Sequence, residues 1–538
     1  MSKNYLIILF IFISIFFVFS FFSAKKESLT YDEVVHLQEG LNALKYHTFA
    51  IDTNNPPLIR ELASLPVFFG SDNFIGSNSS IDKILPARLV VIFLSILLAA
   101  SVFFAAKFYF GIKPAIFSLF LFIFEPNILG NNHYLTLDIG LTLFFFVSFV
   151  LLLKLIKKAL FKNFLIFGVI LGLAMASKIS TIFYFLIITP FLLFVEFKRK
   201  SIPWVWKQKY YIIFSLFLAA FTIWTTYFYK SDVLIVKRED SNRVSSKLLA
   251  SAKAKNHKIL EGAIYFAQYQ KIPLGNYLAA IKNSAIRSKQ NNEVYFLGKS
   301  YSNSKWYFML INFFLKTPLP LFIFFLLSFI PFIKDKHKKN YYLFFLIPLI
   351  AVLFISSVST MSPWVRYLLP AFPFLIITAS TSIKLFNRIY LKIFFILLCL
   401  WYAYGSLSSF PHFISFANEI AGPKDKRYQV LIDSNIDWGQ SLPDIKKYVY
   451  DNKIGSMSLS YFGRDNGDYY GLKSDKNYGS HKFNDICKFH KISKQNWKGN
   501  NITAISISNW YYCGYYKNQK YSKEKIVNVV GDSILIFK

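Results

Sequence analysis

Residues 85–110 read LPARLVVIFLSILLAASVFFAAKFYF, an apolar run whose only charged side chains are Arg88 and Lys107, near its two ends. A helix needs about 20 apolar residues to cross the hydrocarbon core of a bilayer, so this run predicts a transmembrane helix. Comparable runs lie near 5–23, 114–130, 134–153, 163–177, 179–196, 210–229, 306–333, 341–358, 366–385 and 391–409. The sequence therefore predicts an all-α polytopic membrane protein with about eleven transmembrane helices.

The composition of the 538 residues agrees with this prediction, since 54% are hydrophobic and only 17% are charged. This apolar content excludes a disordered chain and is not typical of a soluble one. The formal net charge is +32, which in a soluble protein would suggest nucleic-acid binding. In a membrane protein the same excess has to be compared with the topology first.

The positive charges of the short loops fall on alternate connections. One loop carries Lys154, Lys157, Lys158 and Lys162, and the other two basic loops lie at 198–209 and 334–339. The connections at 130–134 and 359–365 contain no Lys or Arg. The positive-inside rule then places the basic loops and the N-terminus in the cytoplasm, in a protein expected in the plasma membrane. This accounts for the charge without a nucleic-acid partner.

The first apolar run has two interpretations, a signal peptide or a retained anchor. No clear small-residue cleavage site follows it, and Lys25 and Lys26 come directly after it, which favours the anchor. With the N-terminus inside, residues 24–84, residues 230–305 and the tail from 411 face outward.

The tail differs in composition from the rest of the chain. Short β-rich runs occur at 428–433, 457–461, 502–507 and 525–537, among Gly, Asn, Asp and Lys. They predict a small extracytoplasmic α/β domain over 411–538, after a membrane domain over 1–410. Cys487 and Cys513 both fall in this domain, where an oxidising compartment would permit a disulfide, but the sequence does not give their separation.

The first outward segment begins with paired acids, Asp32 and Glu33, followed by His36. Adjacent helical residues point in different directions, so one acid is expected to act on a substrate while the other orients groups or binds it. The alternative is a helix N-terminus with Thr30 as its cap, because the helix dipole favours acids there.

Other ionisable residues lie near the outward ends of the predicted spans, where a hydrocarbon environment makes them costly. Asp138 is just inside the fourth span, and the cations are Arg88, Lys178, Lys316 and Arg366. Taken singly, each cation could be a snorkelling side chain. Together they favour a site for an anionic, membrane-resident substrate, because phosphate oxygens suit Arg and Lys donors.

At these residues the chain resembles the polyprenyl-phosphate-sugar-dependent glycosyltransferases of the protein O-mannosyltransferase-like class, glycosyltransferase family 39, in its bacterial form. The motifs that carry the resemblance run through most of the membrane region in order. They are Asp32-Glu33, Asn55-Pro56-Pro57-Leu58, Pro126 to Asp138, Gly172-Leu173-Ala174 followed by Lys178, Lys316-Thr317-Pro318-Leu319-Pro320, and Arg366-Tyr367-Leu368-Leu369-Pro370. Many relatives have His where Asn55 stands. The segment from Asp433 to Gln440 is also similar to one in bacterial members, although its residues by themselves predict a tight loop capping a helix near 442–450.

The resemblance implies a C-type glycosyltransferase fold that transfers a sugar, with inversion, from a polyprenyl phosphate to a hydroxyl of a protein or glycan outside the cytoplasm. It implies Asp32 as the base and Glu33 as a positioning residue. Arg366, Lys178, Lys316 and Arg88 are the candidates for binding the donor phosphate. Asp138 and His36 are candidates for supporting these groups or for binding a divalent metal, whose presence the sequence leaves open.

Two alternatives stay open. A transporter or lipid flippase also has many spans and intramembrane charges, but no internal repeat is detected and the ionisable groups gather toward one face. The other alternative is transfer to a lipid acceptor instead of a protein or glycan. Donor sugar, prenyl carrier and acceptor cannot be read from the residues.

Overall fold

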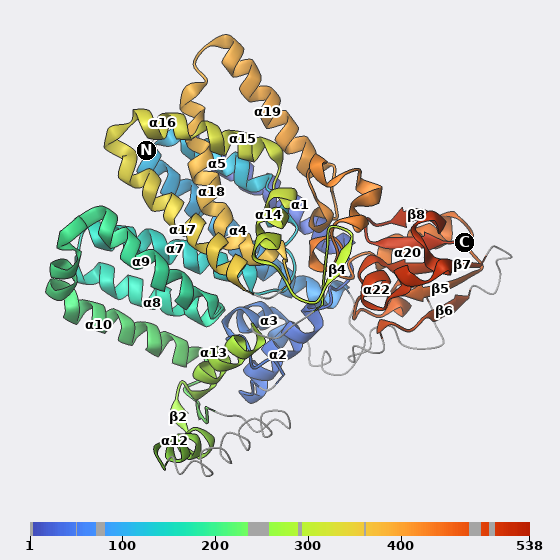
Figure 1. The fold of residues 1–538 in the computed structure, drawn as a ribbon, viewed down its shortest axis with the longest axis horizontal. Helices are drawn as coiled ribbons and strands as arrows, with labels where there is room; N and C mark the ends of the chain where they lie inside the picture. Colours follow the sequence, from blue (N-terminus) through green and yellow to red (C-terminus); the bar gives the residue numbers. More distant parts are fainter. Residues whose placement is uncertain are drawn as a thin grey trace.

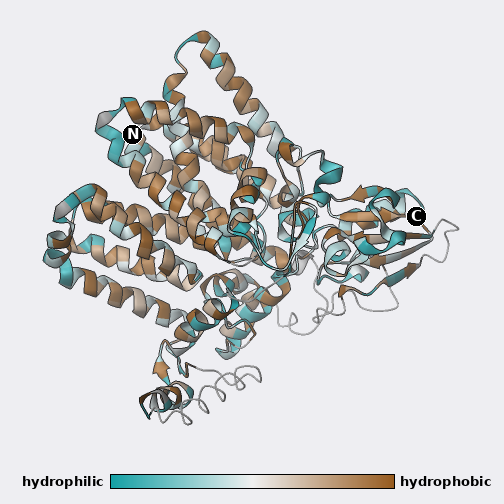
Figure 2. Cartoon of the chain, viewed as in Figure 1, coloured by the Kyte–Doolittle hydropathy of each residue, from teal (hydrophilic) through white to brown (hydrophobic). Residues whose placement is uncertain are grey.

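The computed structural model describes residues 4–49, 51–70, 81–234, 258–288, 293–359, 362–472, 486–493 and 501–538. A large helical bundle carries a small sheet at one end, at the right of Figure 1. Hydrophobic residues dominate the long helices of the bundle, whereas α2 and the segments around the sheet are richer in hydrophilic ones (Figure 2). The predicted fold class, a helical multi-span membrane protein with a small C-terminal α/β part, is confirmed.

Eight helical segments among the described residues are long and apolar enough to cross a membrane. They are α1 (Asn4–Lys26), α4 (Ile81–Phe110), α7 (Asp138–Lys157), α9 (Ser180–Phe197), α10 (Ser201–Thr226), α17 (Lys339–Val358), the run of η3 (Val365–Ala371), α18 (Phe372–Ser380) and η4 (Thr381–Leu385), and α19 (Ile389–Leu407). Two other predicted spans form shorter helices, α5 (Ile112–Ile123) and α8 (Phe161–Ser177). At 1.5 Å per residue α5 extends only about 18 Å, so its length alone does not make it a span.

The predicted span over 306–333 is not one straight helix. It consists of α14 (Trp306–Lys316), α15 (Leu319–Leu327) and α16 (Phe329–Lys334), and the chain bends by 99° between α14 and the other two. The break lies at Thr317-Pro318, where Thr317 is extended with φ −95° and ψ 133°. Proline disfavours the helical conformation of the residue before it, which explains the break. The bend places Lys316 at the elbow. Counted as one bent span, this pair raises the number of candidate spans in the described residues to nine.

Close packing of α8 against α10 depends on two glycines one turn apart. A Cβ on Gly168 would lie 2.6 Å from the carbonyl oxygen of Ser215, and a Cβ on Gly172 would lie 2.6 Å from Cβ of Thr222. Small residues four apart are a common helix contact in membranes, because they let the backbones approach. The two helices therefore pack closely side by side on one flank of the bundle (Figure 1).

The two segments that are predicted to face outward, called the outward segments below, contain short helices along the edge of the bundle (Figure 1). Two belong to the first segment, α2 (Glu33–Tyr46) and α3 (Leu58–Gly70), and two to the later one, α12 (Lys258–Tyr269) and α13 (Gly275–Arg287). The later segment also contains the hairpins β1–β2 (Ser231–Asp232, Ile272–Pro273) and β3–β4 (Val294–Phe296, Lys299–Tyr301). The hydroxyl of Ser284 on α13 donates to the carbonyl oxygen of Asn54 at 2.6 Å, which ties the two segments together.

The C-terminal part contains a five-stranded sheet in the order β6-β5-β7-β9-β8. Its strands are β5 (Ser456–Ser460), β6 (His490–Ser493), β7 (Asn501–Ser506), β8 (Ile526–Val530) and β9 (Ile534–Phe537). Only the β5–β7 pair is parallel among the paired strands described. The helix expected near 442–450 is α20 (Leu442–Asp451), and α22 (Ile507–Tyr512) follows β7 directly.

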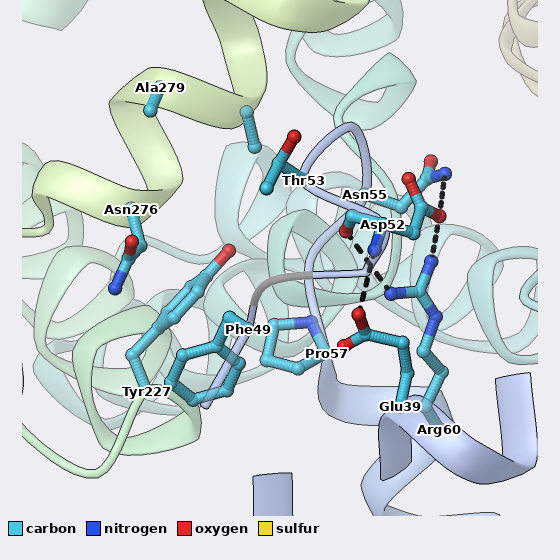
Figure 3. Close-up of a pocket in the computed structure, with 11 residues that line it drawn as sticks. Glu39, Phe49, Asp52, Thr53, Asn55, Pro57, Arg60, Tyr227, Asn276 and Ala279 are labelled. Atoms are coloured by element: carbon cyan, nitrogen blue, oxygen red, sulfur yellow. Dashed lines mark hydrogen bonds and ion pairs between the residues drawn. The ribbon is translucent and has the colours of Figure 1, made fainter. Parts of the chain in front are cut away.

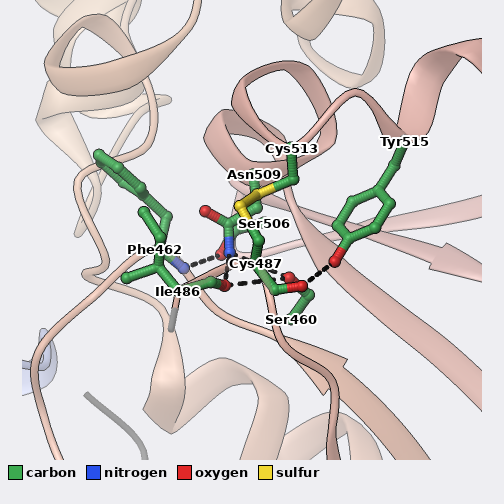
Figure 4. The surroundings of a disulfide bond; sticks show 8 residues. All are labelled: Ser460, Phe462, Ile486, Cys487, Ser506, Asn509, Cys513 and Tyr515. Carbon is green, nitrogen blue, oxygen red and sulfur yellow. Dashed lines mark hydrogen bonds between the residues drawn. A yellow bond between two sulfur atoms is a disulfide. The ribbon is translucent and has the colours of Figure 1, made fainter. Parts of the chain in front are cut away.

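Two details of the tail differ from the prediction. Residues 428–433 do not form a strand, because the chain passes here from the 3-10 helix η7 (Lys424–Gln429) to the 3-10 helix η8 (Asp433–Asn435), and β6 was not predicted. Cys487 and Cys513 form a disulfide with their Cα atoms 5.5 Å apart, which joins the start of the β6 segment to the end of α22 (Figure 4). The side-chain amide of Asn509 braces the same region by donating to the carbonyl oxygen of Ile486 at 2.7 Å.

Candidate active site

The two acids of the first outward segment point to different partners. α2 begins at Glu33, and Asp32 is the residue before it. Asp32 accepts a hydrogen bond from Nη1 of Arg366 at 2.7 Å, whereas Glu33 accepts from Nε of Arg88 at 2.9 Å. The expectation that Asp32 and Glu33 do not contact the same atom is therefore confirmed. The hydroxyl of Thr30 has no hydrogen-bond partner, so Thr30 does not cap the helix with its side chain.

Glu33 and Arg88 form a fully buried ion pair. Both side chains are 0% exposed, and a second contact joins Nη2 of Arg88 to Oε2 of Glu33 at 2.6 Å. The other guanidinium N–H groups donate to the carbonyl oxygens of Ala24, Glu27 and Ser28. All five donors of the guanidinium are then in use, so Arg88 cannot bind a phosphate without losing bonds already made. The contacts place this pair in the framework that fixes the end of α1 against α4 and α2.

Lys316 is held in the same way. Its ammonium group donates to the carbonyl oxygens of Ile414, Phe416 and Asn435, and the residue is 1% exposed. An ammonium has three N–H donors, and these contacts use all of them. Lys316 therefore attaches the tail to the elbow of the bent span. The contacts do not bring it to Asp32.

Arg366 is the predicted cation that the structure brings to Asp32. Its guanidinium carbon lies 4.4 Å from the ring centroid of Trp438 and 4.7 Å from that of Trp364. Its Nε is buried without a hydrogen-bond partner, so the guanidinium retains an unused donor. The side chain of Asp32 is 29% exposed, which leaves the carboxylate accessible.

Asp138 and Lys178 form a second ion pair next to the first. Nζ of Lys178 lies 2.6 Å from Oδ1 of Asp138 and 4.6 Å from the ring centroid of Tyr367. Tyr367 is also 5.4 Å from the guanidinium carbon of Arg366, so one aromatic ring adjoins both cations. The Lys178 side chain is 17% exposed, whereas Asp138 is almost buried.

The surroundings of Asp32 keep it ionised. Partial burial would raise the pKa of its carboxyl, but the positive charge of Arg366 and its hydrogen bond, together with the charge of Arg464, lower the pKa below its ordinary value. A carboxylate that is ionised and partly accessible can accept a proton from a hydroxyl group.

His36 lies one turn along α2 from Asp32 and contacts Arg60, which lines a small cavity. Burial, and then the charge of Arg60, lower the pKa of His36 to about 4, and its Nδ1 accepts from Nε of Arg60 at 3.1 Å. Arg60 pairs in turn with Asp52 (Figure 3). The walls of this cavity come from three parts of the chain and include Glu39, Phe49, Asn55, Tyr227 and Asn276.

A second small cavity lies on the side of the tail and is lined by Trp364, Asn435 and Tyr512 among others. Trp364 also touches Arg366, so the Asp32–Arg366 pair adjoins both cavities through its neighbours. In the described ranges no group of three or more His, Cys, Asp or Glu side chains is arranged to hold a metal ion.

Sequence reasoning missed the tail's contribution to this region. Trp438 and Arg464 both belong to the tail, and they contact Arg366 and Tyr31 respectively. The segment from Asp433 to Gln440 does precede α20 as a loop, but it also packs against the first outward segment. Its similarity to bacterial relatives was the signal that could have pointed to a role at the site.

The family model described as dolichyl-phosphate-mannose-protein mannosyltransferase matches residues 78–225. This match confirms the resemblance on which the sequence-based expectations rest. It covers α4 to α10, including Arg88, Asp138 and Lys178.

Several solved structures are similar to the chain. ArnT from Cupriavidus metallidurans, bound to undecaprenyl phosphate, is 14% identical with a TM-score of 0.49, and the match covers 76% of this chain and 65% of that one. The Archaeoglobus fulgidus oligosaccharyltransferase tethered to an acceptor peptide is 14% identical with a TM-score of 0.47, over 77% of this chain and 55% of that one. The S. cerevisiae protein O-mannosyltransferase complex Pmt1-Pmt2, bound to its sugar donor, is 20% identical with a TM-score of 0.31, over 42% and 32%. No curated protein matches the chain.

Proposed function

We propose that this protein transfers a glycosyl group from a polyprenyl-phosphate sugar to a hydroxyl of a protein or glycan acceptor, on the outer side of the plasma membrane and with inversion. The observation that carries the proposal is the Asp32–Arg366 pair, in which a partly exposed carboxylate lies 2.7 Å from a guanidinium. A base and a cation side by side are what the reaction needs, because one accepts the acceptor's proton and the other stabilises the leaving phosphate. The lipid phosphate in the ArnT complex and the sugar donor in the Pmt1-Pmt2 complex support this choice of donor.

In the proposed reaction the acceptor oxygen attacks the anomeric carbon while Asp32 takes its proton. The bond between the anomeric carbon and the phosphate oxygen breaks, and its electron pair leaves with the phosphate. Arg366 and Lys178 stabilise the charge that develops there. Asp138 holds Lys178 in place, and His36 and Arg60 support α2 behind Asp32. A direct displacement with one carboxylate as base inverts the anomeric centre.

The contacts described above change the roles that we propose for three of the predicted residues. Glu33, Arg88 and Lys316 are saturated by internal partners, so we assign them to the framework of the site. The proposed mechanism does not route a step through a metal.

The proposal includes an orientation of the chain in the membrane. The α9–α10 and α16–α17 turns, which carry basic residues, lie at the left of Figure 1, away from the C-terminal sheet at the right. Basic turns favour the cytoplasmic side, so Asp32 and the tail domain over 411–538 would face outward. A disulfide in the tail supports this assignment, because disulfides persist in oxidising compartments.

The test is transfer by the purified protein in vesicles supplied with a polyprenyl-phosphate sugar and candidate peptide, glycan and lipid acceptors. Asp32→Asn is expected to lower turnover by about two to four orders of magnitude, the range for a lost general base. The matched control is Asp468→Asn, which changes an exposed acid of the tail. Movement of the donor across the vesicle membrane without a covalent product would favour a transporter, and near-normal turnover of Asp32→Asn would remove Asp32 from the mechanism.

A further inference from the structure

The tail forms one wall of the region around Asp32. The backbone N–H groups of Ser28 and Tyr31 donate to the carbonyl oxygens of Gln440 and Trp438, both at 2.9 Å. The ring of Tyr31 stacks on Phe462 with the two planes 6° apart and the centroids at 5.1 Å. The residue before Asp32 is thus fixed by backbone bonds and by an aromatic contact, and both come from the tail.

Two tail loops are pressed together at this wall. Gly439 has φ +88°, a conformation that favours glycine, and a Cβ added there would lie 2.8 Å from Cα of Gly463. This close approach of the 438–440 loop to the 462–464 loop determines where the residue after Gly463 emerges. That residue is Arg464.

Arg464 lies over the ring of Tyr31, with its guanidinium carbon 4.0 Å from the ring centroid. Its Nε is buried without a hydrogen-bond partner, and within the described ranges the side chain forms no ion pair. A guanidinium that is partly removed from water without an anionic partner is costly, unless a ligand supplies one. The adjoining Asp32 carboxylate is already hydrogen-bonded to Arg366.

The four cations that were predicted from the membrane segments differ from Arg464, because each of them has internal partners. Arg88 uses all its donors on Glu33 and backbone carbonyls, Lys316 uses its donors on carbonyls, and Lys178 is paired with Asp138. Arg366 is paired with Asp32, although its Nε remains unused. Arg464, the guanidinium that the tail supplies near Asp32, forms no ion pair with any of the described residues.

We propose that Arg464 binds the phosphate of the lipid-linked donor together with Arg366, so that the C-terminal domain completes the donor site. This inference rests on the proposed function, because it assigns a ligand of the same site. The ligand class is a phosphate ester with an apolar chain. Two guanidinium groups suit it because each presents a planar set of donors to the phosphate oxygens.

The test measures binding to the purified full-length protein with farnesyl phosphate as the charged probe and farnesol as the neutral one. Arg464→Gln is expected to raise the Kd for farnesyl phosphate about tenfold, the order expected for a lost charged hydrogen bond. Farnesol binding is expected to stay unchanged, because it lacks the phosphate. A loss of structure alone would weaken both probes, so the ratio of the two affinities isolates the phosphate contact. Inorganic phosphate is expected to bind much more weakly than farnesyl phosphate, and equal binding would overturn the assignment to a lipid donor.

The matched control is Lys447→Gln, which removes an exposed cation on α20 of the same domain. Should Arg464→Gln fail to fold, Arg464→Lys serves instead, and a severalfold weaker affinity for farnesyl phosphate is expected because lysine lacks the planar fork. Wild-type affinity in the variant that folds would overturn the inference.

Sugar transfer is measured in parallel. Transfer by the wild type together with unchanged binding in the Arg464 variant would leave the proposed function standing without this inference. If farnesyl phosphate binding weakens in Arg464→Gln but the wild type transfers no sugar, Arg464 remains a phosphate ligand and the proposed function is overturned.

Discussion

Nη1 of Arg366 lies 2.7 Å from Oδ2 of Asp32, although 334 positions separate the two residues in the chain. One belongs to the first outward segment and the other opens a span near the far end of the membrane region. Their contact brings the proposed base and the proposed phosphate ligand together, and it couples the protonation of one to the presence of the other.

This coupling predicts a change in pH dependence when Arg366 is removed. Arg366 lowers the pKa of Asp32 against the effect of burial, so Arg366→Ala is expected to raise that pKa. The acidic limb of the profile of kcat/KM against pH would move to higher pH, and the KM for the donor would increase. Arg388→Ala, in an exposed basic turn, is the control. An unchanged acidic limb would show that Arg366 does not control the pKa of Asp32.

The buried Glu33–Arg88 pair predicts a loss of stability when one partner is removed. Glu33→Gln leaves an uncompensated buried guanidinium, which typically costs about 3–5 kcal/mol. The expected result is a clearly lower unfolding temperature in detergent. Turnover per folded molecule should fall much less than in Asp32→Asn. A normal unfolding temperature with a large loss of turnover would return Glu33 to a catalytic role.

The junction between the tail and the first outward segment is expected to depend on pH through His412. Its Nδ1 lies 2.8 Å from Oε1 of Glu27, and its Nε2 lies 3.0 Å from Oδ2 of Asp444. Burial lowers the pKa of His412, but its bonds to Asp444 and Glu27 outweigh this and raise the pKa from 6.5 to about 10. A raised pKa means that the contribution to stability is complete below about pH 6.5 and is lost as the pH rises through about 10.

Unfolding temperatures measured across this pH range test the effect. The wild type should lose stability toward pH 10, and His412→Gln should show a flatter curve from a lower starting value. Parallel curves for the two proteins would show that His412 is not the titrating group.

The disulfide in the tail predicts a local loss of stability. Cys487 and Cys513 are 26 positions apart, and closing a loop of that length stabilises a fold by about 3.5 kcal/mol in the chain-entropy description. Replacing both residues by Ala should lower the unfolding temperature of the tail and speed its proteolysis. Cys399→Ala is the control, because Cys399 is free and lies in a membrane helix. Equal proteolysis of the two variants would contradict the prediction.

The membrane helices could be predicted because apolar length is a local property of the sequence. Residues 85–110 and the other long runs formed helices close to where they were expected. The exceptions have local causes as well. Pro318 breaks the predicted span over 306–333, and the run over 114–130 becomes a helix that ends at Ile123 followed by turns.

The candidate site could be predicted in part. Polar residues at the outward ends of spans marked Asp32, Arg366, Lys178 and Asp138, and the structure brings them into two adjoining ion pairs. The same signal also marked Arg88 and Lys316, whose donors are used by backbone carbonyls and by Glu33. Sequence gives the chemical type of a side chain, but the choice between a ligand and a framework contact depends on which partners surround it in the fold.

The position of the tail's residues at the site could not be predicted from composition or periodicity, and the similarity of the segment from Asp433 to Gln440 to bacterial relatives was the one signal for Trp438. Trp438 and Arg464 lie in loops of a small α/β domain, and nothing in the local sequence around them indicates a contact with the membrane region. Their position follows from long-range hydrogen bonds such as that of the Ser28 hydroxyl to the carbonyl oxygen of Gly439.

That hydrogen bond joins residues 411 positions apart, and it has a consequence for biosynthesis. The first outward segment leaves the ribosome long before the loop around Gly439 is translated. In the orientation that we propose, the loop must then cross the membrane and fold before Tyr31 and Asp32 are held in place. Half-made chains would therefore carry the acid without its completed surroundings, and catalytic competence would arrive only late in synthesis, after the translocation machinery has exported the last domain.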